Sequence, residues 1–316
     1  MNLKLSQPDM LAEARKHGGW GLAVETVVFI IVFIILMDLA GVILLVGIFV
    51  TVAFENAGHG IGGAFMPDSF FPVSQIAQII SIFATLLLAK WFYHRRPWTL
   101  GFKKRNWLRE YAVGMGAGFL MMTLVILLGH ISGCLALQFN HEILTAENGI
   151  LLLVTFLCCQ LQGMGVEVLC RGLCIISMAR KKGNLWAAVI LSSLLFAAAH
   201  LVYLGEGLLF FCNLTLFGIF AGLYFLKRGD IWGIAALHSL WNFTQGNIWG
   251  VPISGIEYGP SIFISVPETG SFLTGGGEFR PESSFFATLV LIIGILILLR
   301  LPQKDVAPLV PETAAK

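Results

Sequence analysis

The last apolar stretch of the chain, SFFATLVLIIGILILLRL at residues 284–301, decides the fold class. It contains one charged side chain, Arg300, which stands at the end of the run. About 20 helical residues, each rising ~1.5 Å, cross the ~30 Å hydrocarbon core of a bilayer, so a run of this kind predicts a membrane-spanning helix. Seven more segments of the same character precede it, near residues 21–53, 71–93, 111–138, 150–179, 185–204, 207–226 and 231–249.

The composition agrees with a chain whose main solvent is lipid. Of 316 residues, 57% are hydrophobic and 12% are charged, whereas soluble domains carry about 25% charged residues. The formal net charge of +2 gives no ground for a nucleic-acid partner. We therefore expect an all-α fold, a polytopic membrane helix bundle of about eight transmembrane helices, in which residues 1–316 form a single transmembrane domain.

Basic residues divide unevenly between the two sides of this bundle. Positively charged loops tend to stay in the cytoplasm. Of the 20 Lys and Arg residues, 18 fall in the N-terminal segment, the C-terminal tail and the loops after the second, fourth and sixth spans, with their flanks. The opposite loops hold only Arg280. The sequence therefore predicts a multi-pass protein of a cell membrane, of bacterial type, with both termini in the cytoplasm.

The longest loop of the predicted bundle, residues 250–283, is rich in glycine and poor in helix formers. One interpretation is an exposed outer loop. The other is a cover that dips back into the bundle, because Ile262, Phe263, Phe272 and Phe279 are apolar. The sequence leaves both interpretations open.

Ionisable side chains within the spans are the strongest functional signal, because each costs on the order of 3 kcal/mol at the centre of a bilayer. Glu167 and Arg171 are four residues apart, which places them on one helix face within reach of an ion pair. His200 lies on the next span, and His238 and Asn242 share a face of a later one. Glu167 and Arg171 alone could be a structural pair. Together, the five residues predict a site assembled across the bundle core.

Three short motifs carry these residues: VEVLCR at 166–171, FAAAH at 196–200 and HSLWN at 238–242. In their order and helix placement they resemble the EExxxR, FxxxH and HxxxN motifs of the CPBP family, the CAAX proteases and bacteriocin-processing enzymes, also called Abi. The resemblance has its core at about residues 145–250, and RRPWTLGF at 95–102 extends it. It implies an intramembrane endopeptidase, a hydrolase that cleaves a membrane-associated CAAX-type or leader-type peptide.

The resemblance also implies the roles of the site residues. A Glu and His200 activate a water, His238 and Asn242 stabilise the oxyanion, and Glu167 with Arg171 completes the catalytic set. No cofactor is expected. If a metal is bound, the resemblance makes it zinc, held by Glu167, His200 and His238. The expected partners are a peptide or protein substrate and the lipid bilayer.

One position departs from the family pattern. The first Glu of EExxxR, the usual general base, falls on Val166, and valine cannot accept a proton. Glu167 corresponds to the second Glu and points ~100° away around the helix. Three interpretations follow: an active enzyme that uses Glu167, a slow variant without the base, and an inactive pseudoprotease that acts as a membrane scaffold or bacteriocin-immunity protein.

Overall fold

The computed structural model describes residues 5–36, 78–181, 184–200, 207–253, 259–268, 273 and 280–304. The second half of the first predicted span and the start of the second lie outside the described residues. So do Phe272 and Phe279 of the long loop.

Helices make up most of the described chain. The longer ones follow the apolar runs of the sequence, and three of them, Gln78–Phe92 included, continue through π-helical turns. The α-helices are α1 (Asp9–Arg15), Leu22–Leu36, Gln78–Phe92, α4 (Trp107–Ile131), α5 (Ala146–Glu167), α6 (Ile176–Arg180), α7 (Leu185–Ala198), α8 (Leu208–Arg228), α9 (Trp232–Phe243) and α10 (Phe285–Arg300). The π-helical turn η4 (Val168–Ile175) joins α5 to α6, and η5 (Thr244–Ile248) extends α9.

Within the described residues, three helical stretches are long and apolar enough to cross a membrane: α4, the continuous run Ala146–Arg180, and α8. The helices Leu22–Leu36 and Gln78–Phe92, together with α7 and α10, are apolar but shorter. The prediction of an all-α membrane helix bundle is confirmed. The count of eight spans stays a prediction.

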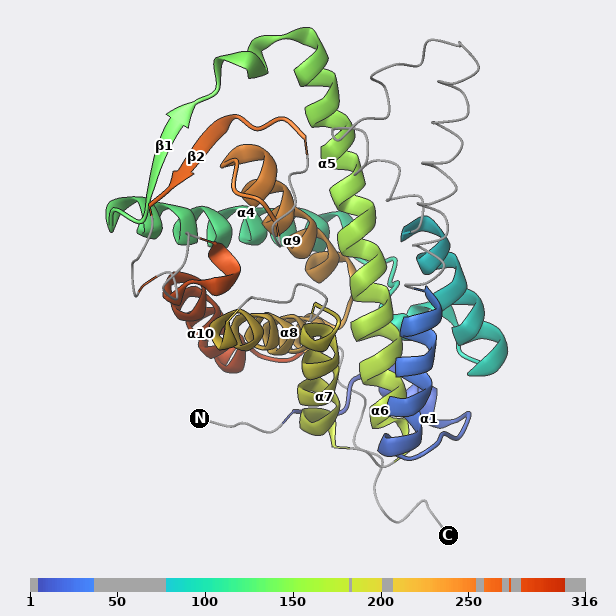
Figure 1. The fold of residues 1–316 in the computed structure, drawn as a ribbon. Helices are drawn as coiled ribbons and strands as arrows, with labels where there is room; N and C mark the ends of the chain where they lie inside the picture. The colour runs from blue at the N-terminus through green and yellow to red at the C-terminus, as the bar shows by residue number, and fades with distance from the viewer. Residues whose placement is uncertain are drawn as a thin grey trace.

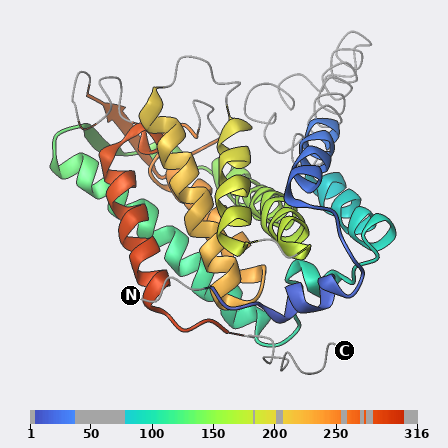
Figure 2. The same ribbon diagram turned by 90° about the horizontal axis from the view of Figure 1, so that it is seen from below.

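Helix α9 is central to the bundle. It packs against α4, α5 and α8, and every residue from Gly233 to Phe243 is buried. Two glycines of α4, Gly114 and Gly118, bring the helices close, because a Cβ on either would overlap a backbone carbonyl of α9. Figure 1 shows α5 running the length of the molecule, with α4, α9, α8 and α10 on one side of it. In the turned view of Figure 2, α10 lies beside α8.

The third predicted span, 111–138, extends beyond the end of the helix that the structure shows. Helix α4 stops at Ile131, and Gly133 follows with a positive φ of 72°, a conformation that ends helices readily. Residues Leu135–Phe139 then form strand β1, which pairs antiparallel with β2 (Phe263–Pro267). Leu135 lies opposite Pro267, and Phe139 lies opposite Phe263. Hydropathy along the sequence could not predict β1, because the strand with which it pairs lies far away in the sequence.

The described parts of the long loop combine a packed cover with an exposed ribbon. Val251 and Ile253 are buried at its start. Phe263 is half-buried, and its ring stacks on Trp249 with 4.9 Å between centroids. Ile264 and Val266 of β2, by contrast, are exposed. The loop returns to the bundle at η7 (Pro281–Ser283), directly before α10.

Candidate active site

The fully buried pair Glu167 and Arg171 lies where α5 passes into η4. Nη1 of Arg171 is 3.0 Å from Oε1 of Glu167. Nη2 of Arg171 donates to the Gly218 carbonyl at 3.4 Å, and the guanidinium lies 5.0 Å from the centroid of the Phe196 ring. These contacts offset the cost of burying both charges. The ion pair expected from the spacing of four residues is therefore formed.

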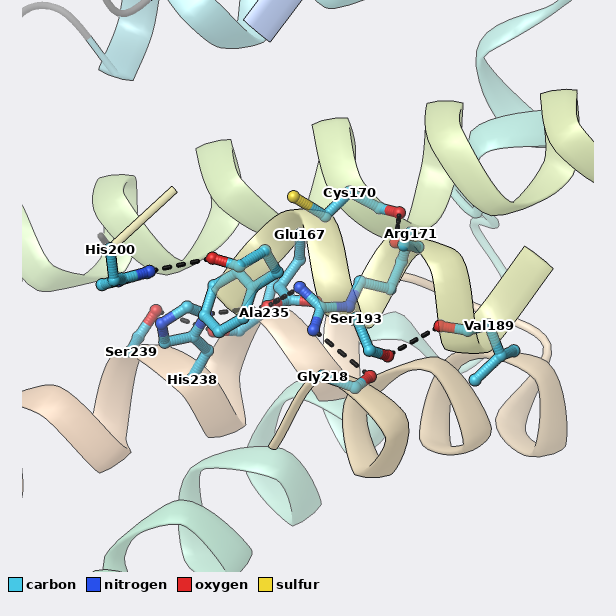
Figure 3. A network of polar contacts seen from close by, with 12 residues as sticks. Glu167, Cys170, Arg171, Val189, Ser193, His200, Gly218, Ala235, His238 and Ser239 are labelled. Carbon is cyan, nitrogen blue, oxygen red and sulfur yellow. Dashed lines mark hydrogen bonds and ion pairs between the residues drawn. The ribbon is translucent and has the colours of Figure 1, made fainter. Parts of the chain in front are cut away.

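His238 of α9 joins this pair. Its Nδ1 is 2.7 Å from the same Oε1 of Glu167. Because a carboxylate oxygen accepts, Nδ1 carries the proton, and in the neutral ring Nε2 is left as an acceptor. Figure 3 shows Arg171, Glu167 and His238 in one network across neighbouring helices.

His200 stands just after α7, and Phe196 holds it in place. Nδ1 of His200 lies 2.9 Å from the Phe196 carbonyl oxygen, which can only accept, so this nitrogen also carries the proton. The Phe196 ring packs against both imidazoles, with centroid distances of 4.9 Å to His200 and 6.1 Å to His238. The phenylalanine of the second motif therefore contacts both histidine rings.

A cavity of about 140 Å³ lies beside the two histidines. A cavity of this size holds a few waters or one side chain. Asn242 lines it and donates from Nδ2 to Oε1 of Gln162 on α5 at 3.1 Å. The amide of Asn242 has a second N–H, so one donor remains for a ligand. Among the described residues, the polar side chains of the lining include Gln162, His200, Asn213, His238, Asn242 and Glu282.

The five predicted site residues divide into two groups. His200, His238 and Asn242 line the cavity, whereas Glu167 and Arg171 do not and lie behind His238. Val166, the residue directly before Glu167, lines the cavity instead. The position that the resemblance assigns to the general base thus faces the cavity with an apolar side chain, and the neighbouring carboxylate faces away.

The zinc set of Glu167, His200 and His238 does not fit this arrangement. Oε1 of Glu167 already accepts from Arg171 and from His238 Nδ1, and Glu167 is separate from the cavity that the two imidazoles line. In the part of the chain that the structure describes, no three His, Cys, Asp or Glu side chains are grouped so as to hold a metal. No step of the chemistry is therefore derived through a metal.

The motifs do not indicate four polar residues that the fold brings to the site: Gln162, Asn213 and Glu282, which line the cavity, and Gln245, which donates to Glu282. Gln162 lies four residues before Val166, so helical spacing from the first motif could have found it. Gln245 lies seven residues after His238 and could have been found in the same way. Glu282 stands in the long loop, where no periodic signal exists, and only the packing of η7 brings it to the cavity.

Residues 148–244 match the family model described as Type II CAAX prenyl endopeptidase Rce1-like. This part of the chain is similar to the Rce1-like family. The Rce1-like part begins in the first turn of α5 and ends directly after α9, so it contains all three motifs. The resemblance to CAAX proteases is therefore confirmed, and the family is one of membrane proteases. Searches of curated proteins and of solved structures found no match to the chain.

Proposed function

We propose that the chain is an intramembrane endopeptidase that hydrolyses a peptide bond of a membrane-associated peptide of CAAX or leader type. The observation that carries the proposal is the pair of imidazoles on one cavity, each held through Nδ1 by a fixed acceptor. Such anchoring sets the tautomer and orientation of a catalytic histidine in acyl-transfer enzymes. Asn242 adds an amide donor on the same wall.

These residues can divide the work of hydrolysis. Neutral His200 has its lone pair on Nε2, where it accepts a proton as the water oxygen attacks the carbonyl carbon. The oxyanion that forms accepts a hydrogen bond from Asn242 and, when His238 is protonated, a second one from Nε2–H of His238. His200 then returns its proton to the amide nitrogen as the C–N bond breaks. Glu167 acts through His238 and is a positioning residue, and Arg171 balances its charge.

Val166 favours a second candidate function, peptide binding without effective hydrolysis. A carboxylate base typically contributes ~10²- to 10⁴-fold to such a reaction, and the wall where the family pattern has one is apolar. A chain of this kind would act as a membrane scaffold or an immunity protein that holds a peptide in the cavity.

Cleavage of CAAX-type and leader-type peptides by the purified full-length chain tests the proposal. The unmodified chain is expected to cleave slowly, and His200→Ala is expected to abolish this cleavage. Val166→Glu is expected to raise the rate ~10²- to 10⁴-fold, because it restores a base beside the imidazoles. Val166→Gln is the matched control, since the amide has nearly the same shape as the carboxylate and cannot accept the proton at neutral pH.

Two outcomes would contradict the endopeptidase proposal. If neither the unmodified chain nor Val166→Glu cleaves any peptide while both bind one, the scaffold function is the better description. If Val166→Gln raises cleavage as much as Val166→Glu does, the gain comes from polarity or packing, and position 166 is not the place of a base.

A further inference from the structure

Arg95 opens the segment RRPWTLGF and has no role in the proposed chemistry. The residue is buried, with 2% of its surface exposed, although it carries a permanent charge. Its Nε donates to Oγ1 of Thr99 at 3.1 Å, and its Nη2 donates to the Thr99 carbonyl at 2.7 Å. Thr99 lies in η2 (Pro97–Leu100), so these bonds fix the guanidinium to the turn that follows it. Burial of a guanidinium is costly even where its donors are used, which indicates that its position matters.

The same guanidinium reaches the helix that carries the buried ion pair of the site. Its Nη2 also donates to the carbonyl of Gly172 in η4 at 3.1 Å, and its Nη1 donates to Oγ of Ser177 in α6 at 3.1 Å. Gly172 permits the close approach of η2, because a Cβ there would lie 2.7 Å from the Leu100 carbonyl oxygen. Arg95 therefore fastens η2 to η4 and to α6.

A second side chain bonds to η4 from another helix. Ser192 of α7 donates from Oγ to the carbonyl of Cys170 at 2.8 Å, and Figure 3 shows Cys170 on the turn that also carries Arg171. A side chain that enters the backbone ladder of a helix commonly accompanies a departure from regular α-helical geometry. Two carbonyls of η4 accept from other elements in this way, and η4 is π-helical over its eight residues, Val168–Ile175. The π-helical form therefore has support from η2 and from α7.

The π-helical form of η4 sets the rotation of α5. A π turn holds about one residue more than an α turn, because its hydrogen bonds join residues i and i+5 rather than i and i+4. If η4 became a regular α-helix while α6 stayed in place, α5 would turn about its axis by roughly 100°, the angle of one residue. Each residue of α5 would then take the angular position of the residue before it. Glu167 would face the cavity where Val166 lies now, and it would leave its present position beside His238.

We propose that Arg95 holds η4 in its π-helical form and is thereby a positioning residue of the site. In this form Val166 faces the cavity and Glu167 stays bonded to His238. Arg95 acts through the carbonyl of Gly172 rather than on a bound peptide. A guanidinium suits this role, because its planar fork reaches acceptors of η2, η4 and α6 at the same time. The role in positioning rests on the proposed function, whereas the rotation of α5 can be measured without a peptide.

Thiol labelling at the cavity wall tests this rotation. In the purified full-length chain, Val166→Cys places a thiol on the cavity, and Cys212→Ser removes the exposed native thiol, since the other five native cysteines are buried. A small methanethiosulfonate reagent should label this background in detergent. Adding Arg95→Met, which keeps a long side chain without its donors, should lower the labelling rate about 10-fold or more, because position 166 turns away from the cavity and a buried thiol is inert.

Three further variants control for a merely structural effect. Arg96→Met is the matched control, because Arg96 is the exposed neighbour of Arg95, and it should leave the labelling rate unchanged. Arg95→Lys keeps the charge without the planar fork, so it should restore part of the rate. Ser192→Ala removes the second donor to η4 without orphaning a charge, and it should lower the rate by a smaller amount. Loss of the fold would instead make the buried native thiols reactive.

An unchanged labelling rate at position 166 in the folded Arg95→Met chain would overturn the role of Arg95. If Arg95→Met does not fold, Arg95→Lys and Ser192→Ala decide the matter, and unchanged rates in both overturn it. Peptide cleavage separates this failure from failure of the proposed function. Reduced labelling, without cleavage by the unmodified chain or by Val166→Glu, supports the hold of Arg95 on η4 and overturns the endopeptidase. Unchanged labelling together with cleavage overturns the role of Arg95 and supports the endopeptidase.

Discussion

Oε1 of Glu167 accepts from Arg171 and from His238, so one atom links two motifs that lie 71 residues apart. Burial of the carboxylate is tolerated because Arg171 supplies a permanent positive charge beside it. His238 supplies a hydrogen bond from Nδ1 in either protonation state, but it supplies a positive charge only when it is protonated. The two partners are therefore not equivalent, and their separate loss should have different consequences.

Arg171→Ala is expected to lower the free energy of unfolding by about 3–5 kcal/mol, because it leaves the Glu167 carboxylate buried without its permanent counter-charge. Thermal unfolding in detergent, followed by a folding-sensitive signal, measures the effect. Asn242→Ala is the comparison variant, because its loss leaves no orphan charge. The double change Glu167→Gln with Arg171→Met should recover much of the stability. Equal melting temperatures for Arg171→Ala and Asn242→Ala would show that the pair contributes no special stability.

Sequence spacing predicts part of this network and misses the rest for a definite reason. Four residues between Glu167 and Arg171 place both on one helix face, so their contact could be predicted. Whether that face turns toward the cavity depends on how α5 is rotated against α9, and no single-helix pattern contains this information. The structure turns Val166 to the cavity and Glu167 toward His238 from behind. The roles of the five site residues stay proposals.

At the scale of elements, apolar runs located the helices, because a bilayer requires length and continuity. Strand β1 was missed, since its five residues are as apolar as the helix before them and its pairing with β2 is not local. The contact between α4 and α9 was not predicted either. It depends on small residues in register on one helix, which hydropathy cannot detect.

The close packing of α4 on α9 can be tested by adding a methyl group to one of two glycines of α4 and comparing the stability of the two variants. Gly118→Ala places a Cβ against the Leu237 carbonyl and is expected to destabilise the fold by roughly 1–3 kcal/mol through overpacking. Gly116 lies two residues away on the exposed face, where an added Cβ would meet open space, so Gly116→Ala should be neutral or slightly stabilising. Thermal unfolding of both variants in detergent measures the difference.

Because α9 carries His238 and Asn242, displacement by Gly118→Ala should also weaken peptide binding, whereas Gly116→Ala should leave binding unchanged. If the two alanine variants have the same stability and the same peptide affinity, the close packing of α4 on α9 is not what positions the site.

At the scale of the whole molecule, ion pairs connect segments that the loop charges assign to one side. Lys103 lies 2.9 Å from Asp9 of α1, and Arg180 at the end of α6 lies 3.1 Å from Glu25. Glu110 at the start of α4 binds Arg228 at the end of α8 and, at 2.9 Å, Lys304 of the tail. Ion pairs therefore join segments that are distant in sequence. The topology of the chain and its orientation in the membrane stay predictions.

Reporter fusions test the topology directly. The excess of basic residues places the loop after the fourth span, at residue 182, in the cytoplasm and residue 145 on the opposite side. A reporter that is active only in the cytoplasm should therefore be active when fused after residue 182 and silent after residue 145. A reporter active only outside should give the reverse, which controls for unequal expression. The continuous helix Ala146–Arg180 lies between the two points and is long enough to cross the bilayer. If both fusions report the same side, this helix does not span, and the cavity that it shares with α9 lies at the membrane surface rather than within it.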